Sequence, residues 1–162
     1  MDCPFGIYCR LQGEIFLDDL GWLRKRLTKL YKRNPHVKLL QIRVADISKG
    51  TAFLEMAAEY EKHGNLHGVV HGGAVASLAD TAMGVACSTL GNKVVTVDMN
   101  INFIKNAGLG IIRAVGKVLH SGRHTMVAEA EIFDTGNVLL AKARGTFFVV
   151  GQFEQGDEED DA

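Results

Sequence analysis

The chain has 162 residues, with 18 lysines and arginines against 19 aspartates and glutamates, for a formal net charge of -1. This balance excludes a uniformly basic nucleic-acid-binding protein, and the length predicts one domain large enough to bury a hydrophobic core. The 18 glycines against 2 prolines indicate tight turns, or backbone that comes close to another group.

Two segments of opposite charge lie near the chain ends. The acidic segment contributes six acids within the last nine residues: Glu154, Asp157, Glu158, Glu159, Asp160 and Asp161. We interpret residues 151–162 as a disordered, solubilising tail. The basic segment contains Arg24, Lys25, Arg26, Lys29, Lys32 and Arg33. These side chains either attract phosphate or simply face water.

Cysteine count and apolar segments bear on the compartment. The odd number of cysteines, Cys3, Cys9 and Cys87, without zinc-binding spacing favours a reducing compartment, so we expect a cytoplasmic protein. The start MDCPFGIYCRLQ has no signal-peptide pattern. Residues 72–90 are apolar but carry Asp80, which favours a buried core helix over a membrane span.

Hydrophobic periodicity predicts the elements in chain order. Residues 14–34 form an amphipathic helix that ends at Asn34-Pro35, giving an N-terminal extension over residues 1–34. Two strands at 41–48 and 51–58 flank Lys49-Gly50 as a hairpin. A glycine- and histidine-rich loop then leads into a long helix over 73–90, apolar around most of its circumference.

Four further strands complete the pattern, at 94–104, 111–120, 125–134 and 137–150. Helix, two strands, long buried helix and four strands describe an α+β protein in which an antiparallel sheet wraps around one helix. No P-loop or GxGxxG motif in a βαβ unit is present, which excludes the common nucleotide-binding folds.

Three histidines spaced four apart, His63, His67 and His71, would line one face of a helix and suggest zinc. Four glycines within the same segment make such a helix costly, at about 1 kcal/mol each relative to alanine. We therefore expect no metal site.

The glycine-rich loop enters the long helix at Gly72 and Gly73, where free backbone N–H groups lie at the positive end of the helix dipole. Such groups hold an oxyanion or a carbonyl oxygen, and the missing side chains allow close approach. The alternative is that the two glycines only permit a tight helix entry.

Asp80 is a single carboxylate on an otherwise apolar helix, where burial is costly without hydrogen bonds. It acts as a general base that activates water, as a nucleophile, or as a structural acid satisfied by its neighbours. On the strand 94–104, strict alternation places Thr96 and Asp98 on one polar face with Asn100 and Asn102, which we expect to line the same cleft.

The segment NLHGVVHGGAVASLAD resembles the loop-and-helix signature of PaaI-type hotdog acyl-CoA thioesterases. VVTVDMNINFIKNA resembles the following strand of these enzymes, and GRHTMVAEAEIF and LLAKARGTFFVV resemble their closing strands. The resemblance covers residues 35–150, which we take as the hotdog thioesterase domain. It implies a hotdog fold, a homodimer joined edge to edge with shared active sites, and often a tetramer.

Carried over by position, the resemblance makes Gly72 the oxyanion-hole donor and Asp80 of the opposite subunit the base or nucleophile. Asn65 orients water or the thioester, and His71 supports the loop. Thr96 stands where the family can carry a serine, so it keeps a hydroxyl that can position water. Asn106 departs from the proline that relatives often have, a change that bears on the substrate entrance.

Thioester hydrolysis needs mainly carbonyl polarisation and a placed nucleophile, because a thiolate leaves readily; no cofactor is implied. Gly73 would also contact substrate, and five side chains are candidates for the phosphates of coenzyme A: Lys105, Arg123, His124, Lys142 and Arg144. Lys142 and Arg144 can instead pair with Glu129 and Glu131 across the sheet.

The leading hypothesis is therefore an acyl-CoA thioesterase without a metal, nucleic-acid or membrane partner. The main alternative is a non-catalytic acyl-CoA sensor that uses its basic helix to contact an acidic partner, although a single helix is a poor DNA-binding module. A hydratase on the same fold ranks lower, because His71 adjoins the expected oxyanion glycine. The sequence leaves the acyl group, aromatic or fatty, open.

Overall fold

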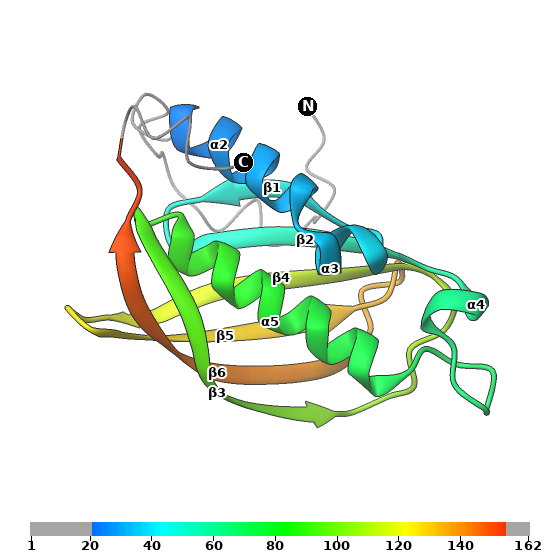
Figure 1. Cartoon of the computed structure of the whole chain (residues 1–162). Coiled ribbons are helices and arrows are strands. Elements are labelled where there is room, and N and C mark those ends of the chain that lie inside the picture. The colour runs from blue at the N-terminus through cyan, green and yellow to red at the C-terminus, as the bar shows by residue number, and fades with distance from the viewer. Residues whose placement is uncertain (1–20, 155–162) are drawn as a thin grey trace.

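The computed structural model describes residues 21–154 of the chain. Over that range one antiparallel sheet curves around the long helix α5 (Gly72–Ser88), as predicted (Figure 1). The strands are β1 (Ile42–Ser48), β2 (Thr51–Ala58), β3 (Asn92–Phe103), β4 (Gly110–Ser121), β5 (Thr125–Phe133) and β6 (Leu139–Gln152). The remaining helices are α2 (Gly21–Arg33), α3 (Pro35–Leu39) and α4 (Tyr60–His63).

The strand order in the sheet is β1-β2-β4-β5-β6-β3, with every neighbouring pair antiparallel. Strand β3 follows α5 in the chain but pairs with β6, so it forms one edge of the sheet and β1 forms the other. An edge strand of twelve residues presents a long row of unpaired backbone groups, which a second strand can satisfy.

Helix α5 is the centre of the hydrophobic core, and twelve of its seventeen residues are buried. Its small side chains allow close approach to the sheet: a Cβ added at Gly116 of β4 would lie 2.2 Å from the carbonyl oxygen of Ala82. The apolar circumference predicted from the sequence is therefore covered by strands on most sides. The helix ends two residues earlier than predicted, and Gly91 follows with a positive φ of 84°.

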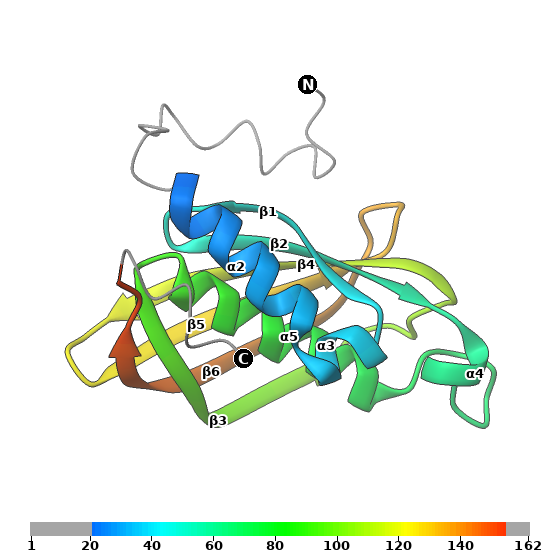
Figure 2. The same ribbon diagram turned by 45° about the horizontal axis from the view of Figure 1, so that its top comes forward.

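Helix α2 lies across the open side of the sheet beside β1 (Figure 2). It buries Leu23 and Leu27, and Tyr31 reaches α5, where its hydroxyl lies 3.7 Å from the position of a Cβ on Gly84. Residues 14–20 of the predicted helix lie outside the described residues. The predicted stop at Asn34-Pro35 holds for α2, but a second short helix follows because Asn34 caps it by accepting from the backbone N–H groups of His36 and Val37.

The short helix α4 was missed by the sequence interpretation, because four residues carry no periodic pattern. It holds His63 in a buried position where both ring nitrogens are satisfied: Nδ1 accepts from the N–H of Glu59 at 3.0 Å, and Nε2 donates to the carbonyl oxygen of Leu40 at 2.9 Å. His63 is therefore a structural residue that anchors the start of the glycine-rich loop.

No helix among residues 21–154 is both long and apolar enough to cross a membrane. Residues 155–162, which hold most of the predicted acidic tail, lie outside the described residues, as do Cys3 and Cys9.

Candidate active site

The first turn of α5 leaves one backbone donor unused. His71 is the N-cap residue, and its Nδ1 accepts from the N–H of Gly73 at 2.8 Å, while its carbonyl oxygen accepts from Ala74 at 3.0 Å. Among residues 21–154, no acceptor lies within hydrogen-bond distance of the Gly72 N–H. This group therefore stands free at the positive end of a seventeen-residue helix, as an oxyanion hole requires.

The loop before α5 is built around Asn65. Its side-chain oxygen accepts from the backbone N–H of His67 at 2.8 Å and of Val69 at 3.4 Å, and its own N–H donates to the carbonyl oxygen of Val69 at 2.8 Å. These bonds fix the side chain but use only its oxygen. The side-chain nitrogen of Asn65, Nδ2, has no acceptor within the described part of the chain and remains available to donate.

Two backbone hydrogen bonds hold the last residues of the loop in place. Val70 donates to the carbonyl oxygen of Ala107 at 2.9 Å, and His71 donates to that of His63 at 2.7 Å. A surface groove of about 590 Å³ runs along this loop, lined by Tyr60, Glu61, Gly64, Asn65, Leu66, His67, His71 and Gly72. The predicted site residues Asn65, His71 and Gly72 therefore line the same groove.

Asp80 lies two turns further along α5, partly buried, and its Oδ1 accepts from the hydroxyl of Thr96 at 2.7 Å. This bond orients the carboxylate and leaves Oδ2 without a partner among the described residues. The sequence pattern alone had not joined these two residues directly. A carboxylate with one oxygen held and the other open is suited to accept a proton from water or to attack a carbonyl.

Asp80 and Gly72 do not meet within one chain. Eight residues of helix separate them by about 12 Å along the axis, and Asp80 does not line the groove that holds Asn65 and Gly72. A carbonyl hydrogen-bonded to Gly72 is therefore out of reach of the same chain's Asp80. One chain thus holds the Gly72 N–H and the Asp80 carboxylate at separate places along α5.

The predicted common polar face on β3 is wrong, because the strand contains a bulge. Thr96 pairs with Phe147 and Asp98 with Thr146, so Val97 is an extra residue that reverses the alternation. Thr96 faces α5, whereas Asp98, Asn100 and Asn102 lie on the outer face of the sheet. There they line a second groove of about 390 Å³ with Glu129, Lys142, Ala143, Arg144, Gly145 and Thr146.

The candidates for coenzyme A phosphates divide into two groups. Lys142 bonds Glu131 at 3.0 Å and Glu129 at 3.4 Å, and Arg144 lies 4.0 Å from Glu129, so both pair across the outer face as the alternative held. The hydrogen bond to Glu131, with the neighbouring carboxylates, raises the pKa of Lys142. These two side chains have partners and are weak phosphate candidates.

Lys105 follows β3, whereas Arg123 and His124 lie in the β4–β5 turn, where the ring of His124 stacks on Phe148 at 6.5 Å. The pairing of β5 with β6 and of β6 with β3 places this turn at the opposite end of the sheet from Lys105. One chain therefore does not bring Lys105 together with Arg123 and His124.

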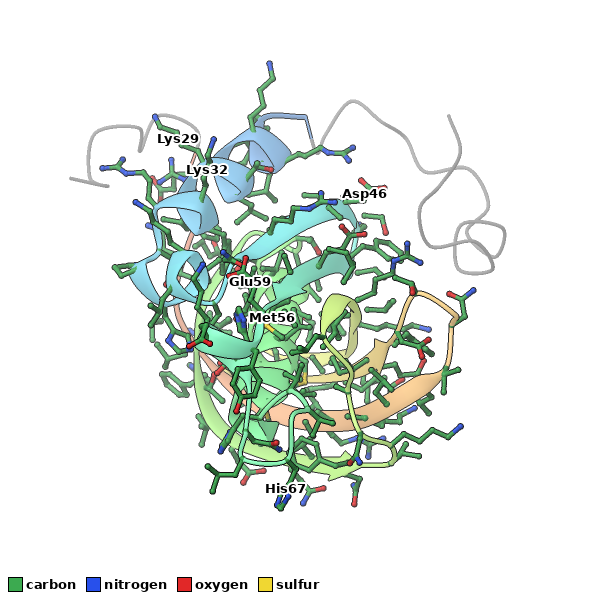
Figure 3. All side chains as sticks on the ribbon, turned by 90° about the vertical axis from the view of Figure 1, so that its right-hand side faces the viewer. Lys29, Lys32, Asp46, Met56, Glu59 and His67 are labelled. Carbon is green, nitrogen blue, oxygen red and sulfur yellow. The ribbon has the colours of Figure 1, made fainter. Side chains whose placement is uncertain are left out.

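The three histidines of the loop do not converge. His63 is buried, His71 caps α5, and His67 points outward at the far end of the loop from α2 (Figure 3). No group of three His, Cys, Asp or Glu residues suited to a metal ion occurs within residues 21–154.

Phe103 lies beside the candidate site, although no sequence motif marks it. A Cβ built on Gly72 would lie 3.2 Å from Cζ of this ring, so the ring packs beside the free N–H. More than half of the side chain is nevertheless exposed. The signal was the glycine itself: a residue without a side chain at 72 is what allows the contact.

A curved antiparallel sheet wrapped around one long helix defines the hotdog fold. The model of the thioesterase superfamily matches residues 67–141. The chain is 30% identical to acyl-coenzyme A thioesterase PaaI of Escherichia coli over 123 residues, covering 75% of this chain and 87% of the relative. It is 32% identical to human acyl-coenzyme A thioesterase 13, covering 62% of this chain and 88% of the relative.

Among solved structures, E. coli PaaI superimposes with a TM-score of 0.74 at 29% identity, covering 81% of this chain and 94% of that one. The chain therefore belongs to the thioesterase superfamily and is a thioesterase of the PaaI-type hotdog family.

Proposed function

We propose that the protein hydrolyses acyl-CoA thioesters to a free acid and coenzyme A, with each active site shared between two copies of the chain. The observation that carries this proposal is the free Gly72 N–H at the start of α5 together with the Thr96-held carboxylate of Asp80. The names of its relatives, which include acyl-coenzyme A thioesterases from bacteria and humans, support the substrate class.

The N–H of Gly72 polarises the thioester carbonyl. As a nucleophile attacks, negative charge develops on the carbonyl oxygen, and a fixed donor at a helix N-terminus stabilises that charge without reorganising. The Asn65 amide nitrogen lines the same groove and supplies a second donor for the carbonyl oxygen or for the attacking water.

Asp80 supplies the base or the nucleophile. As a base, Oδ2 takes a proton from water while the water oxygen attacks the carbonyl carbon; the C–S bond then breaks, and the departing thiolate receives a proton. As a nucleophile, the carboxylate attacks the carbonyl carbon, the C–S bond breaks to release the coenzyme A thiolate, which takes up a proton, and water then cleaves the resulting anhydride to the free acid and the aspartate. In both routes the Thr96 hydroxyl keeps Oδ1 hydrogen-bonded.

The separation within one chain supports a two-copy site. Gly72 and Asp80 lie about 12 Å apart along the helix, while the twelve-residue edge strand β3 beside α5 offers a surface for pairing with a second β3. Antiparallel pairing of two copies would bring the two helices side by side in opposite directions, with Gly72 of one copy facing Asp80 of the other. Residues 35–150 form this unit, dimeric or, by further pairing, tetrameric.

Release of coenzyme A thiol across short, medium, long and aromatic acyl-CoAs tests the proposal. We expect turnover of some of these thioesters by the wild type, and a loss of at least about 100-fold in kcat for Asp80→Asn, which keeps the side-chain shape and removes the charge. The same panel measures the acyl preference. A wild type that releases no thiol from any substrate contradicts the proposal.

The sensor hypothesis has the opposite signature, namely tight acyl-CoA binding without thiol release. The hydrogen-bonded, half-open carboxylate of Asp80 has no role in a site that only binds, so hydrolysis is favoured. The proposal also includes hydrolysis without a cofactor. It includes a cytoplasmic location as well, which the odd cysteine count indicated.

A further inference from the structure

The exposed side of α2 carries a surface of one charge. Between Gly21 and Leu39 the chain has seven lysines and arginines and no aspartate or glutamate. Arg24 pairs with Asp46 of β1, and Arg26 is half-buried. Four remaining side chains of α2 point to solvent and form what we call the basic stripe: Lys25, Lys29, Lys32 and Arg33.

The members of the basic stripe repel one another. Lys25 and Lys29, and Lys29 and Arg33, stand four residues apart on one helix face, a spacing at which like charges destabilise a helix. Figure 3 shows Lys29 and Lys32 projecting from the same helix. Among residues 21–154, no carboxylate lies within ion-pair distance of these four side chains. An arrangement with this cost indicates a partner of negative charge.

The described part of the chain ends next to this helix. Phe153 comes directly after β6, donates its N–H to the carbonyl oxygen of Gly91 at 2.8 Å, and lies under two cations: Cζ of Arg26 and Nζ of Lys93 are each 5.5 Å from its ring centroid. The contact with Arg26 attaches the end of the sheet directly to α2. The chain after Phe153 therefore starts beside the basic helix.

The residues after Phe153 make up the acidic segment. From Glu154 onward the sequence is EQGDEEDDA, with six acids in nine residues and no basic residue. The eight residues after Glu154 can span at most about 26–29 Å when extended, whereas a helix of thirteen residues is about 20 Å long. The segment can therefore reach every member of the basic stripe from its attachment at Phe153.

We propose that the basic stripe of α2 is the docking surface for the chain's own acidic segment, residues 154–161. Because the two are joined through Phe153, the acidic segment is present at a high local concentration and needs few specific contacts. It neutralises the repulsion within α2 and competes with other polyanions for this surface. The pairing gives one role to the two charged segments that the thioesterase site does not use.

Energy transfer from Trp22, the only tryptophan of the chain, tests the proposal directly. A dansyl acceptor is placed at position 162 through Ala162→Cys in a Cys3→Ser, Cys9→Ser background, where Cys87 is buried. We expect efficient transfer at low salt and a marked decrease as the Debye length falls from about 10 Å at 0.1 M to about 3 Å at 1 M ionic strength.

Matched variants separate docking from mere proximity. Lys29→Gln with Lys32→Gln should reduce the transfer at low salt, and so should amide replacements of the five acids at 157–161. Lys105→Gln with Lys117→Gln removes the same number of exposed charges elsewhere and should leave the transfer unchanged. Transfer that is insensitive to salt and to the α2 variant overturns the proposal.

A second measurement distinguishes an external polyanion as the occupant. Heparin should bind a chain that ends at Phe153 at least several-fold more tightly than the full chain, because the acidic segment no longer competes. Equal affinity of the two chains contradicts docking and assigns the basic stripe to an external acidic partner instead. None of these readouts depends on hydrolysis, so they stand or fall independently of the proposed activity.

Discussion

At the residue scale, three atoms carry the proposed chemistry: the backbone nitrogen of Gly72, Oδ2 of Asp80 and the side-chain nitrogen Nδ2 of Asn65. Hydrogen bonds made by neighbouring atoms hold these groups in place. Nδ1 of His71 accepts from the Gly73 N–H beside Gly72, and the Thr96 hydroxyl donates to Oδ1 of Asp80. The residue types could be predicted from the sequence, because glycines at a helix start and a single acid on an apolar helix are unusual. Their hydrogen-bond partners could not, because these depend on atomic positions.

Thr96 tests the support of the carboxylate. Thr96→Val removes the hydroxyl that donates to Asp80 at 2.7 Å while keeping the side-chain volume. We expect kcat to fall by about 10-fold with little change in KM, since a group that only orients the base acts in the transition state. Thr96→Ser keeps the hydroxyl and should retain most of the activity. Equal kcat values for Thr96→Val and wild type would remove the supporting role.

A substitution at Gly72 tests the close approach of substrate to the proposed oxyanion hole. In Gly72→Ala the new Cβ meets Cζ of Phe103 at 3.2 Å, so the helix start or the ring must shift by a few tenths of an ångström. We expect a loss of about 100-fold in kcat, similar to losing an oxyanion donor. Phe103→Leu in the same chain shortens the ring and should restore part of the rate. Full activity of the single variant would show that this backbone position is unimportant.

Cys87 gives a pH prediction. Burial raises the pKa of this thiol from 9.0 to about 12, so the folded state holds the proton more tightly than the unfolded state. Its contribution to stability is complete below pH 9 and is lost as pH rises towards 12. The denaturation midpoint of wild type should therefore fall more steeply above pH 9 than that of Cys87→Ala. Parallel pH profiles of the two proteins would contradict this.

At the scale of elements, the sheet and the long helix could be predicted because their hydrophobic periods are clear. The bulge at Val97 could not, since an inserted residue in a strand leaves no mark in the alternation of side-chain types. It moved Asp98, Asn100 and Asn102 to the outer face and left Thr96 beside Asp80. The partners of α2 also could not be predicted, because its apolar stripe does not specify which surface it covers.

The packing of α2 changes the expected effect of a truncation. A helix that only covered an acyl pocket could be removed with residues 1–34 without much effect on folding. Leu23 and Leu27 are buried in the main core, so their removal exposes that core. We expect the truncated chain to melt well below the full chain, because each lost leucine contributes about 2 kcal/mol or more. Thermal denaturation followed by circular dichroism measures this, and an unchanged melting temperature would contradict the observed packing.

Gly116 tests the contact between α5 and the sheet. A Cβ there would lie 2.2 Å from the carbonyl oxygen of Ala82, a backbone atom that cannot swing aside. Gly116→Ala should destabilise the protein by about 3 kcal/mol or more. Gly108→Ala is the matched control, because nothing lies within 4 Å of its added Cβ. Similar urea midpoints for the two variants would show that α5 does not rest on β4 in this way.

At the scale of the whole molecule, the proposed active site is divided between two chains. The resemblance to PaaI-type enzymes implied a shared site, and the 17-residue helix supports it because Gly72 and Asp80 stand near its start and its middle. Val97 projects from the edge strand β3 and is 64% exposed. Val97→Asp places a charge on that edge, so we expect a monomer in sedimentation, with native circular dichroism and little thiol release. A fully active monomer would contradict the shared site.

The most direct test of the central claim mixes two inactive variants. The Asp80→Asn and Gly72→Ala proteins are combined in equal amounts under conditions in which subunits exchange. Random pairing then makes about half of the dimers mixed. A shared site predicts that each mixed dimer contains one intact site, so thiol release should recover to about a quarter of the wild-type rate. If each site instead lies within a single chain, every site in the mixture keeps one defect, and the mixture stays as inactive as its components.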